Sequence, residues 1–451
     1  MSLPRYPEYK PSGVEWLGEV PGHWEVKRLK QASHVFPSNV DKKSHDGETP
    51  VSLCNYTDVY YNDTITADME FMAATASTEQ IAKFTLRAGD TIITKDSETA
   101  DDIAIGAYVP ADLPNVVCGY HLAMIRPLAD TNGAFVKRLF DSTYVRSCVA
   151  VRANGLTRVG LGQYEIDNLE LPFPPPEEQQ IIAAFLDRET GKIDALITEQ
   201  RRLVELLAEK RQAVISHAVT KGLNPNARTK DSGIAWLGEV PEHWEVCAIK
   251  RMTILITDGA HISPETDDGV YDFVSTKDIS DAGIDFEGCL KTSPSSYEFL
   301  VRSGCQPARG DVLFSKDGTI GRTIVVKEGR EFVVASSLII IRPDGAVLDS
   351  TFLHYLCQSF LVIQQVEGFV KGAGLPRLSI QNLLKVFGVF PQLEEQQAIA
   401  TFLNSETAKF DTLTAEANRA IELLQERRSA LISAAVTGKI DVRSFTEREP
   451  L

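Results

Sequence analysis

The chain is written twice, and this internal repeat limits its fold more than any other feature. Residues 12–26 read SGVEWLGEVPGHWEV and residues 232–246 read SGIAWLGEVPEHWEV, with twelve of fifteen positions identical. Residues 174–223 match residues 391–440 in the same way, with 27 of 50 positions identical. The two offsets, 220 and 217, agree closely. Each half therefore holds an opening motif, a body of about 150 residues and a closing segment.

A period near 220 residues is far longer than the roughly 20–50 residues of a solenoid repeat. It indicates two tandem copies of one globular unit and predicts a pseudo-two-fold molecule, and the length of 451 residues agrees with two or three domains. The expected boundaries are 1–173 for the first body, 174–225 for a first helical spacer, 226–390 for the second body, and 391–451 for a second spacer with the C-terminal tail.

Each closing segment predicts one long amphipathic helix. Glu177 and Glu178 follow a run of prolines, and acids in the first turn stabilise the start of a helix. Apolar residues from Ile193 to Val214 recur at alternating steps of three and four, which is typical of a coiled coil. Residues 177–219 as one helix would measure about 65 Å. We expect the two helices to pack antiparallel on each other; the alternative is that each packs only on its own body.

The two bodies predict a mixed α/β (α+β) fold. Short β-branched runs between turn signals predict strands over 90–94, 103–105, 311–315, 322–326, 332–334 and 338–341. Residues 135–147 and 351–365 predict helices. Several segments correspond between the bodies, among them Gly155-Leu-Thr-Arg158 and Gly374-Leu-Pro-Arg377. A shared frame with divergent loops is how a recognition domain is built.

Composition and motifs exclude several classes of protein. No apolar run approaches the 18 residues of a membrane span, and the N-terminus has no apolar signal region, so we expect a cytoplasmic protein. The seven cysteines include no C-x-x-C pair, which argues against a zinc module and a disulfide framework. The eight histidines form no cluster, and we expect His23 and His243 of the opening motifs to pack in the core.

Catalytic motifs are absent as well. The chain has no G-x-x-x-x-G-K-[ST] loop, no H-E-x-x-H, no G-x-S-x-G and no Asn/Asp-Pro-Pro-aromatic tetrad of an amino-methyltransferase. We therefore expect neither enzyme activity nor a cofactor or metal in this chain. An enzyme with an unrecognised nuclease or methyltransferase site is the alternative.

Residues suited to DNA contact lie in loops, although the net charge of −16 is unfavourable for DNA binding as a whole. Asn, Lys and Arg suit base edges and phosphates, and glycine-rich loops let an Arg approach the backbone closely. The candidates in the first body are Lys42, Lys43, Asn55, Tyr56, Lys95, His121, Arg152 and Arg158. Those in the second are His261, Lys277, Lys316, Arg322, Ser336, Lys371 and Arg377.

The opening S-G-x-x-W-L-G-x-V-P-x-H-W motif and the closing E-Q-Q-x-I-A-x-F-L motif each occur twice. In this doubled arrangement, which spans residues 12–440, the chain resembles the DNA-specificity subunit of type I restriction-modification systems. The resemblance implies two target recognition domains separated by two long helices in an antiparallel coiled coil. Each domain would read one half of a split double-stranded DNA target, and the coil would act as a ruler for the gap. The loops around Lys95, Arg158, Lys316 and Arg377 would face the DNA.

The resemblance also implies partners, since the family's subunit is not an enzyme. Two methylation subunits would supply S-adenosylmethionine chemistry, and two restriction subunits would use ATP and Mg²⁺. The methylation subunits would dock on the helices 177–220 and 394–437. The expected partner-helix residues are Phe185, Leu186, Leu203, Leu207, Phe402, Leu403 and Leu424. A structural scaffold that only pairs partner subunits, without sequence readout, is a further alternative.

Overall fold

The structure is a computed structural model, and it describes residues 3–234, 236–265, 269–280, 283–327, 329–370 and 377–445. It divides into two compact units. Unit 1 holds Met1–Gln200 with Arg419–Leu451, and unit 2 holds Arg201–Asn418. The long helices α6 (Pro176–Lys221) and α11 (Leu393–Val436) each contribute one end to each unit. The predicted single helices over the closing segments are therefore confirmed.

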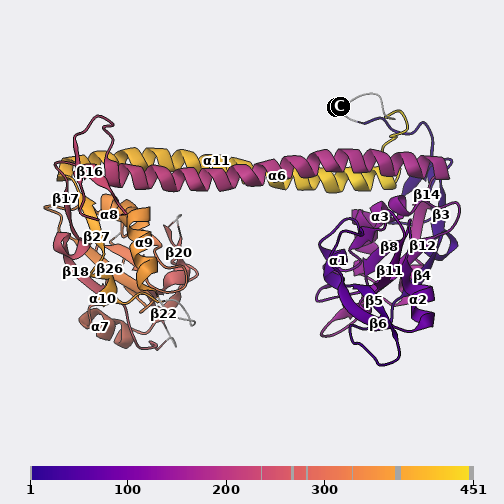
Figure 1. Cartoon of the computed structure of the whole chain (residues 1–451), viewed down its shortest axis with the longest axis horizontal. Helices are drawn as coiled ribbons and strands as arrows, with labels where there is room; N and C mark the ends of the chain where they lie inside the picture. The colour runs from indigo at the N-terminus through magenta and orange to yellow at the C-terminus, as the bar shows by residue number, and fades with distance from the viewer. Residues whose placement is uncertain are drawn as a thin grey trace. The chain divides into compact units, whose positions relative to one another are not determined.

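Within each unit the two helix ends lie side by side and run antiparallel (Figure 1). In unit 1, Ile182 near the start of α6 shares a core with Val436 at the end of α11. Further along, Asp194 accepts a hydrogen bond from Arg428 at 2.8 Å. In unit 2 the end of α6 shares a core with the start of α11, among residues that include Ile215, Val219, Ile399 and Leu403. The helices thus pack on each other as well as on the bodies.

The body of unit 1 is a three-layer arrangement of helices and two sheets. The first sheet has the order β10-β8-β12-β4 and is antiparallel throughout. Successive residues of its strands face opposite layers, as pleating requires. Ile92 and Met124 pack toward the second sheet, whereas Ile93 and Ile125 pack toward the helices. The strands are β4 (Ser33–Pro37), β8 (Thr91–Thr94), β10 (Gly106–Tyr108) and β12 (Leu122–Pro127).

The second sheet of unit 1 has the order β6-β5-β11-β7, in which β5 and β11 run parallel. Its strands are β5 (Thr49–Cys54), β6 (Met72–Ala76), β7 (Thr85–Leu86) and β11 (Leu113–Cys118). A separate pair joins β3 (Glu25–Arg28) of the opening motif to β14 (Glu170–Phe173), which directly precedes α6. The opening motif also forms a hairpin of β1 (Tyr9–Pro11) and β2 (Glu19–Pro21).

Unit 2 repeats this topology except that its second sheet has no counterpart of β7 in the described residues, so the expected tandem mixed α/β architecture is confirmed. Its first sheet has the order β18-β26-β23-β24, and its second has the order β22-β19-β25 with β19 and β25 parallel. The strands are β18 (Thr253–Asp258), β19 (Tyr271–Val274), β22 (Leu290–Thr292), β23 (Val312–Ser315), β24 (Thr323–Val325), β25 (Phe332–Val334) and β26 (Leu338–Pro343). The flanking pairs are β15 (Thr229–Asp231) with β16 (Glu239–Pro241), and β17 (Glu245–Ala248) with β27 (Phe387–Phe390).

Two sequence predictions about the bodies need correction. Each predicted helix is two helices, because a serine interrupts it: Ser142 accepts a hydrogen bond from Val145 N at 3.2 Å and starts a new helix. The helices are α3 (Gly133–Asp141), α4 (Thr143–Ala150), α8 (Ser350–Gln358) and α9 (Phe360–Phe369). The predicted strand 103–105 is wrong, since Ala104 has a φ of 60° and β10 begins only at Gly106.

A glutamate joins the opening motif to the closing helix in both units, and it is buried in unit 1 and half-buried in unit 2. Glu178 accepts hydrogen bonds from Trp24 Nε1 at 3.0 Å and Tyr6 Oη at 2.7 Å, and pairs with His23 at 2.7 Å. Glu395 repeats the contacts with Trp244 at 3.3 Å and His243 at 2.8 Å. The tryptophans are fully buried, but the histidine side chains are 40% and 55% exposed. The prediction that these histidines pack in the core is therefore wrong.

The glutamine that follows this glutamate holds the body in place. The side-chain oxygen of Gln179 accepts a hydrogen bond from Asn132 N at 2.8 Å, and its amide nitrogen donates to Pro174 O at 2.9 Å. Gln396 makes the same two contacts, with Asp349 N and Pro391 O. These contacts give a physical reason for the repeated Glu-Gln pair, because each side chain ties the first turn of a long helix to a different part of its body.

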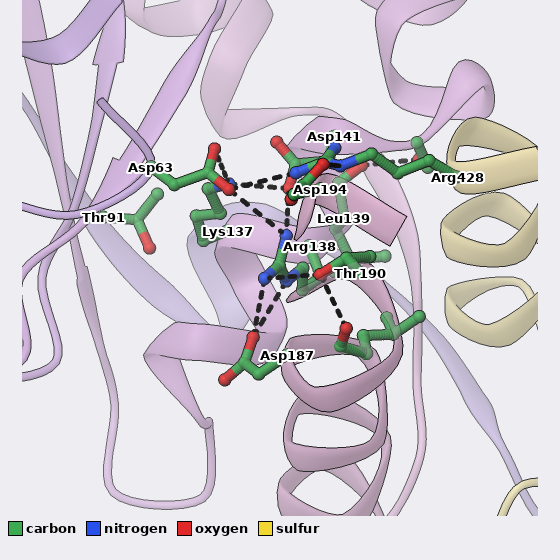
Figure 2. Close-up of polar contacts among 12 residues, drawn as sticks. Asp63, Thr91, Lys137, Arg138, Leu139, Asp141, Asp187, Thr190, Asp194 and Arg428 are labelled. Atoms are coloured by element: carbon green, nitrogen blue, oxygen red, sulfur yellow. Dashed lines mark hydrogen bonds and ion pairs between the residues drawn. The ribbon is translucent and has the colours of Figure 1, made fainter. Parts of the chain in front are cut away.

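The contacts of α3 and α8 with the long helices differ between the units, and Figure 2 shows those of unit 1. In unit 1, the Arg138 ion-pair cluster joins Lys137 and Arg138 of α3 to Asp63, Asp141 and Asp187. In unit 2, the corresponding position holds Tyr355, whose hydroxyl contacts Asn404 at 2.9 Å and Thr407 at 3.1 Å. One junction is therefore held by charges and the other by neutral hydrogen bonds.

No helix in the described part of the chain is long and apolar enough to cross a membrane. All seven cysteines are buried free thiols.

Candidate nucleic-acid interface

Strand direction brings most of the predicted DNA-contacting residues to one edge of each body. In unit 1, β4, β5, β8 and β11 end at this edge and β12 begins there. The residues just outside those strands form what we call the loop edge of unit 1: residues 38–40, 55–56, 95–97 and 119–121. The corresponding loop edge of unit 2 consists of residues 258–261, 275–277, 316–317 and 335–337.

Lys95 lies at the centre of the loop edge of unit 1. Its backbone N–H donates to His121 O at 3.0 Å, and its ammonium donates to Ser38 O at 3.1 Å. The ammonium also lies 4.6 Å from the ring centroid of Tyr120, which is 51% exposed. His121 Nδ1 lies 2.9 Å from a carboxylate oxygen of Asp96. An ammonium has three donors, so this arrangement orients Lys95 without using all of them.

Three tyrosines extend the loop edge along α1 (Tyr56–Tyr60). Tyr56 stacks on Tyr60 with 5.4 Å between ring centroids, and Tyr60 meets Tyr61 edge to face at 4.9 Å. Tyr61 is 76% exposed. Burial raises the pKa of Tyr56 despite a hydrogen bond with Ser97 that lowers it, so the phenol remains a donor at neutral pH. Sequence reasoning missed Tyr60 and Tyr61, although aromatic residues four apart beside a helix start are a readable signal.

Asn55, predicted to contact DNA, also starts this helix. Its backbone N–H donates to the Asp58 carboxylate at 2.7 Å. In unit 2, Ser275 N donates to Asp278 at 2.7 Å in the same way. The position therefore has a structural role in both units, and its side chain is half-buried in both.

The two arginines of the loop that follows α4 have different positions. Arg158 is exposed, in a loop where β13 (Val159–Gly160) pairs with β9 (Asp96–Ser97). The turn is tight: Gly155 has a φ of +151°, and a Cβ there would lie 1.9 Å from Arg158 O. Arg152, in contrast, donates to Cys148 O at 2.8 Å and caps the C-terminal end of α4. Its guanidinium is thus already engaged by its own helix.

Lys316 occupies the place of Lys95 in unit 2, but its side chain is buried. Its backbone N–H donates to Ser337 O at 2.9 Å, as Lys95 does to His121 O. Its ammonium pairs with Asp258, and only 4% of the side chain is exposed. Burial raises the pKa of Asp258, but the hydrogen bonds from Lys316 and His261 lower this pKa by more. The net pKa of Asp258 therefore lies below its usual value. The prediction that Lys316 faces DNA is therefore wrong; the exposed group of this cluster is His261.

Arg377 is exposed at the loop edge of unit 2, where it contacts Ser336 Oγ at 3.4 Å and Asp317 at 3.7 Å. The predicted equivalence of Arg377 with Arg158 is wrong by two residues. Leu378 N donates to Lys316 O and Leu161 N donates to Lys95 O, both at 2.8 Å. Arg377 therefore corresponds to Gly160. In unit 1 the exposed Arg158 lies two residues earlier, in a longer turn.

The remaining residues predicted to contact DNA differ in how exposed they are. Lys42 and Lys43 are exposed in the loop that follows β4, and Lys277 is exposed in η4 (Thr276–Asp278). Arg322 is half-buried and donates to Ile279 O at 3.1 Å. Lys371 lies outside the described residues.

The predicted partner-helix residues are mostly unavailable to a partner. Phe185, Leu186 and Leu403 are 2%, 0% and 0% exposed, because they pack in the cores of their own units. Leu207 is also buried and Leu424 is half-buried. Only Leu203 and Phe402, at 42% and 38%, are exposed. Most of the predicted residues therefore stabilise this chain itself. Four leucines that were not predicted are also exposed on the two helices: Leu196, Leu206, Leu413 and Leu423.

Comparison with known proteins agrees with this duplicated architecture. Residues 21–206 and 241–423 each match the type I restriction modification DNA specificity domain, and together they cover more than half of the chain. The chain belongs to this family. It is a specificity subunit with two target recognition domains, the non-catalytic member of a type I system.

Several relatives span most of the chain. The type I restriction enzyme EcoBI specificity subunit of Escherichia coli is 24% identical over 325 residues, which cover 70% of this chain and 68% of the relative. The type I restriction enzyme MjaIX specificity subunit of Methanocaldococcus jannaschii is 23% identical over 454 residues, with 95% and 96% covered.

Two solved structures share the fold. One, described as the structural basis of complex assembly and conformational transition of the type I R-M system, has a TM-score of 0.69 at 16% identity and covers 92% of this chain and 98% of its own. The HsdS subunit from Thermoanaerobacter tengcongensis has a TM-score of 0.51 at 17% identity, with 93% and 98% covered.

Proposed function

We propose that this specificity subunit reads a split DNA target, with one half-site for each unit. The observation that carries the proposal is a common backbone frame with different side chains on it. Lys95 and Lys316 make the same backbone contact at the two loop edges. The next strand, however, is preceded by Tyr120 and His121 in unit 1 and by Ser336 and Ser337 in unit 2. Two similar frames with different donors and acceptors fit two different half-sites.

The long helices would set the gap between the half-sites. Helix α6 has 46 residues and α11 has 44, and both continue from one unit into the other. At 1.5 Å per residue α6 measures about 69 Å, or about two turns of DNA at roughly 34 Å each. A spacer of this length would fix the length of the gap between the two half-sites.

The chemistry would come from partner subunits in a cytoplasmic complex, with no cofactor in this chain. In the described residues, no group of three or more His, Cys, Asp or Glu side chains could hold a metal ion. Two methylation subunits would use S-adenosylmethionine to methylate one adenine in each half-site. Restriction subunits would use ATP and Mg²⁺. This chain would contribute the choice of site.

The proposal can be tested by mapping methylated adenines in a genome where the chain is co-expressed with its methylation subunit. We expect a bipartite motif with one methylated adenine in each half. His121→Ala should relax the first half only, and His261→Ala the second half only. A continuous motif, or methylation without a motif as a scaffold would give, would contradict the proposal. His34→Ala, at an exposed position of β4 outside both loop edges, is the matched control and should leave the bases of both halves unchanged.

A further inference from the structure

Each opening motif holds one buried and one exposed tryptophan. Trp24 and Trp244 are fully buried, whereas Trp16 is 59% exposed and Trp236 is 50% exposed. Removing an indole from water is strongly favourable, and exposed tryptophans are enriched at the anchor points of protein interfaces. The same exposed tryptophan in both copies of the repeat therefore points to an interaction surface that is present twice.

The same backbone hydrogen bonds form on either side of both indoles. In unit 1, Ser12 N donates to Gly18 O at 2.8 Å, and Gly18, with a φ of +70°, donates to Val14 O at 3.1 Å. In unit 2, the contacts of Ser232 with Gly238 and of Gly238 with Ile234 repeat at 3.0 Å and 3.2 Å. A turn that is already ordered loses little conformational entropy when a partner binds it.

A lysine at or just after the end of a long helix fixes each turn to its unit. Lys439 Nζ donates to Glu19 O at 2.9 Å, and Lys221 Nζ contacts the equivalent Glu239 O. Beside Trp16, the turn and helices α4 and α11 enclose a groove of about 550 Å³, lined by residues that include Thr143, Tyr144 and Ser433. In this groove Thr143 N donates to Ser433 Oγ at 2.9 Å, and unit 2 repeats the contact between Phe360 and Ser216.

Exposed acids outnumber bases in the segment around each indole, while Lys439 lines the groove beside Trp16. Residues 8–25 carry four exposed acids, Glu8, Glu15, Glu19 and Glu25, against the single base Lys10. Residues 228–245 carry four exposed acids, Asp231, Glu239, Glu242 and Glu245, against Arg228 and Lys230. Such a surface repels phosphate and favours a partner with basic side chains. The occupant that fits is a protein with an apolar pocket rimmed by Lys or Arg.

We propose that Trp16 and Trp236 anchor two identical protein partners, which in a type I complex are the two methylation subunits. The inference rests on the proposed function and adds the opening turns to the docking surface expected on the long helices. Two identical partners need two identical surfaces. The opening motifs share twelve of fifteen residues, whereas the loop edges differ. The exposed tryptophan turns therefore meet this requirement, and the loop edges do not.

The test is native mass spectrometry of the chain co-expressed with the methylation subunit of its own system. The wild-type chain should carry two methylation subunits. Trp16→Ala and Trp236→Ala should each weaken one of the two binding events by about thirtyfold or more, and the double variant should carry none at micromolar concentration. Tyr164→Ala is the control, because Tyr164 is 75% exposed but lies outside the repeated motifs.

A second variant leaves both indoles in place. Glu19→Lys with Glu239→Lys should weaken binding several-fold and reduce its dependence on salt. Wild-type affinity for two methylation subunits in both the tryptophan and the glutamate double variants would overturn the inference while leaving the proposed function intact. A wild-type chain that binds no methylation subunit would instead refute the proposed function.

Discussion

Replacing Arg138 by alanine should destabilise the junction between the first body and its long helices. The guanidinium is 9% exposed and makes two hydrogen bonds to Asp187, at 2.7 and 3.1 Å, and one to Asp141 at 3.1 Å. Removing one member of a buried ion pair costs about 3–5 kcal/mol. The lower end applies here, because Asp187 is 57% exposed and can be hydrated, and Asp141 keeps Lys137 at 2.8 Å. We therefore expect a loss of about 3 kcal/mol.

Native-state hydrogen exchange measures this loss locally, without requiring the whole chain to unfold in one step. Amides of α3 should lose protection by roughly a hundredfold, since 1.4 kcal/mol corresponds to a factor of ten. Arg146→Ala is the matched control: Arg146 is exposed on the neighbouring helix, so its loss should cost under about 0.5 kcal/mol. Tyr355→Phe, at the corresponding position of unit 2, removes neutral hydrogen bonds and should cost about 1 kcal/mol. A loss of protection below about threefold in Arg138→Ala would refute the reasoning.

Four further predictions follow from the described contacts. Burial raises the pKa of Asp63, but Lys137, Arg428 and Arg138 lower it to a net value below the usual one. The contribution of Asp63 to stability is therefore fully present above the unfolded pKa of about 3.9. This contribution is lost as pH falls through the folded pKa. The difference in unfolding free energy between wild type and Asp63→Asn should be constant near pH 7 and shrink below about pH 4. Glu178→Ala leaves three partners without their acceptor and should lower the unfolding free energy by about 3 kcal/mol, measured by urea denaturation. The control Glu177→Ala, at the exposed neighbouring position, should lower it by under about 1 kcal/mol. Fluorescence anisotropy should give a Kd above about 1 µM for the isolated chain and its target at physiological salt, because the net charge is −16; nanomolar binding would contradict this. Insertion of seven residues, about two turns, into each long helix should widen the gap of the methylated motif and leave both half-sites unchanged.

The sequence was sufficient to predict the large-scale architecture because repetition and helical periodicity are local signals. The repeat at offsets of 220 and 217 predicted two copies of one fold, and the apolar spacing predicted helices α6 and α11 nearly to their ends. The breaks at Ser142 and Ser359 were missed, since a serine inside an apolar pattern carries little weight in a sequence. In the structure the Ser142 hydroxyl accepts from Val145 N at the start of α4, and the Ser359 hydroxyl donates to Leu356 O at the end of α8.

The candidate interface was predictable as a set of loops but not residue by residue. Lys316 looked like an exposed base because its partner, Asp258, lies 58 residues earlier in the chain. Phe185 and Leu186 looked like a docking stripe because periodicity identifies an apolar face but not which element covers it. The exposed Trp16 and the buried Trp24 share one motif, and only the three-dimensional packing separates them.

Neither repeat of the sequence encodes a complete structural unit, because each unit contains residues from both repeats. Unit 1 is completed by residues from the end of the second repeat: Asp441 N donates to Pro4 O at 2.8 Å, and Gly438 sits against Trp24. Unit 2 is completed in the same way by the end of α6 from the first repeat, where Gly222 lies against Trp244. The two repeats have thus exchanged helix ends, as in a domain swap fused into one polypeptide. A chain cut between the repeats would give two fragments that each need the other, or a second copy of itself, to close its core.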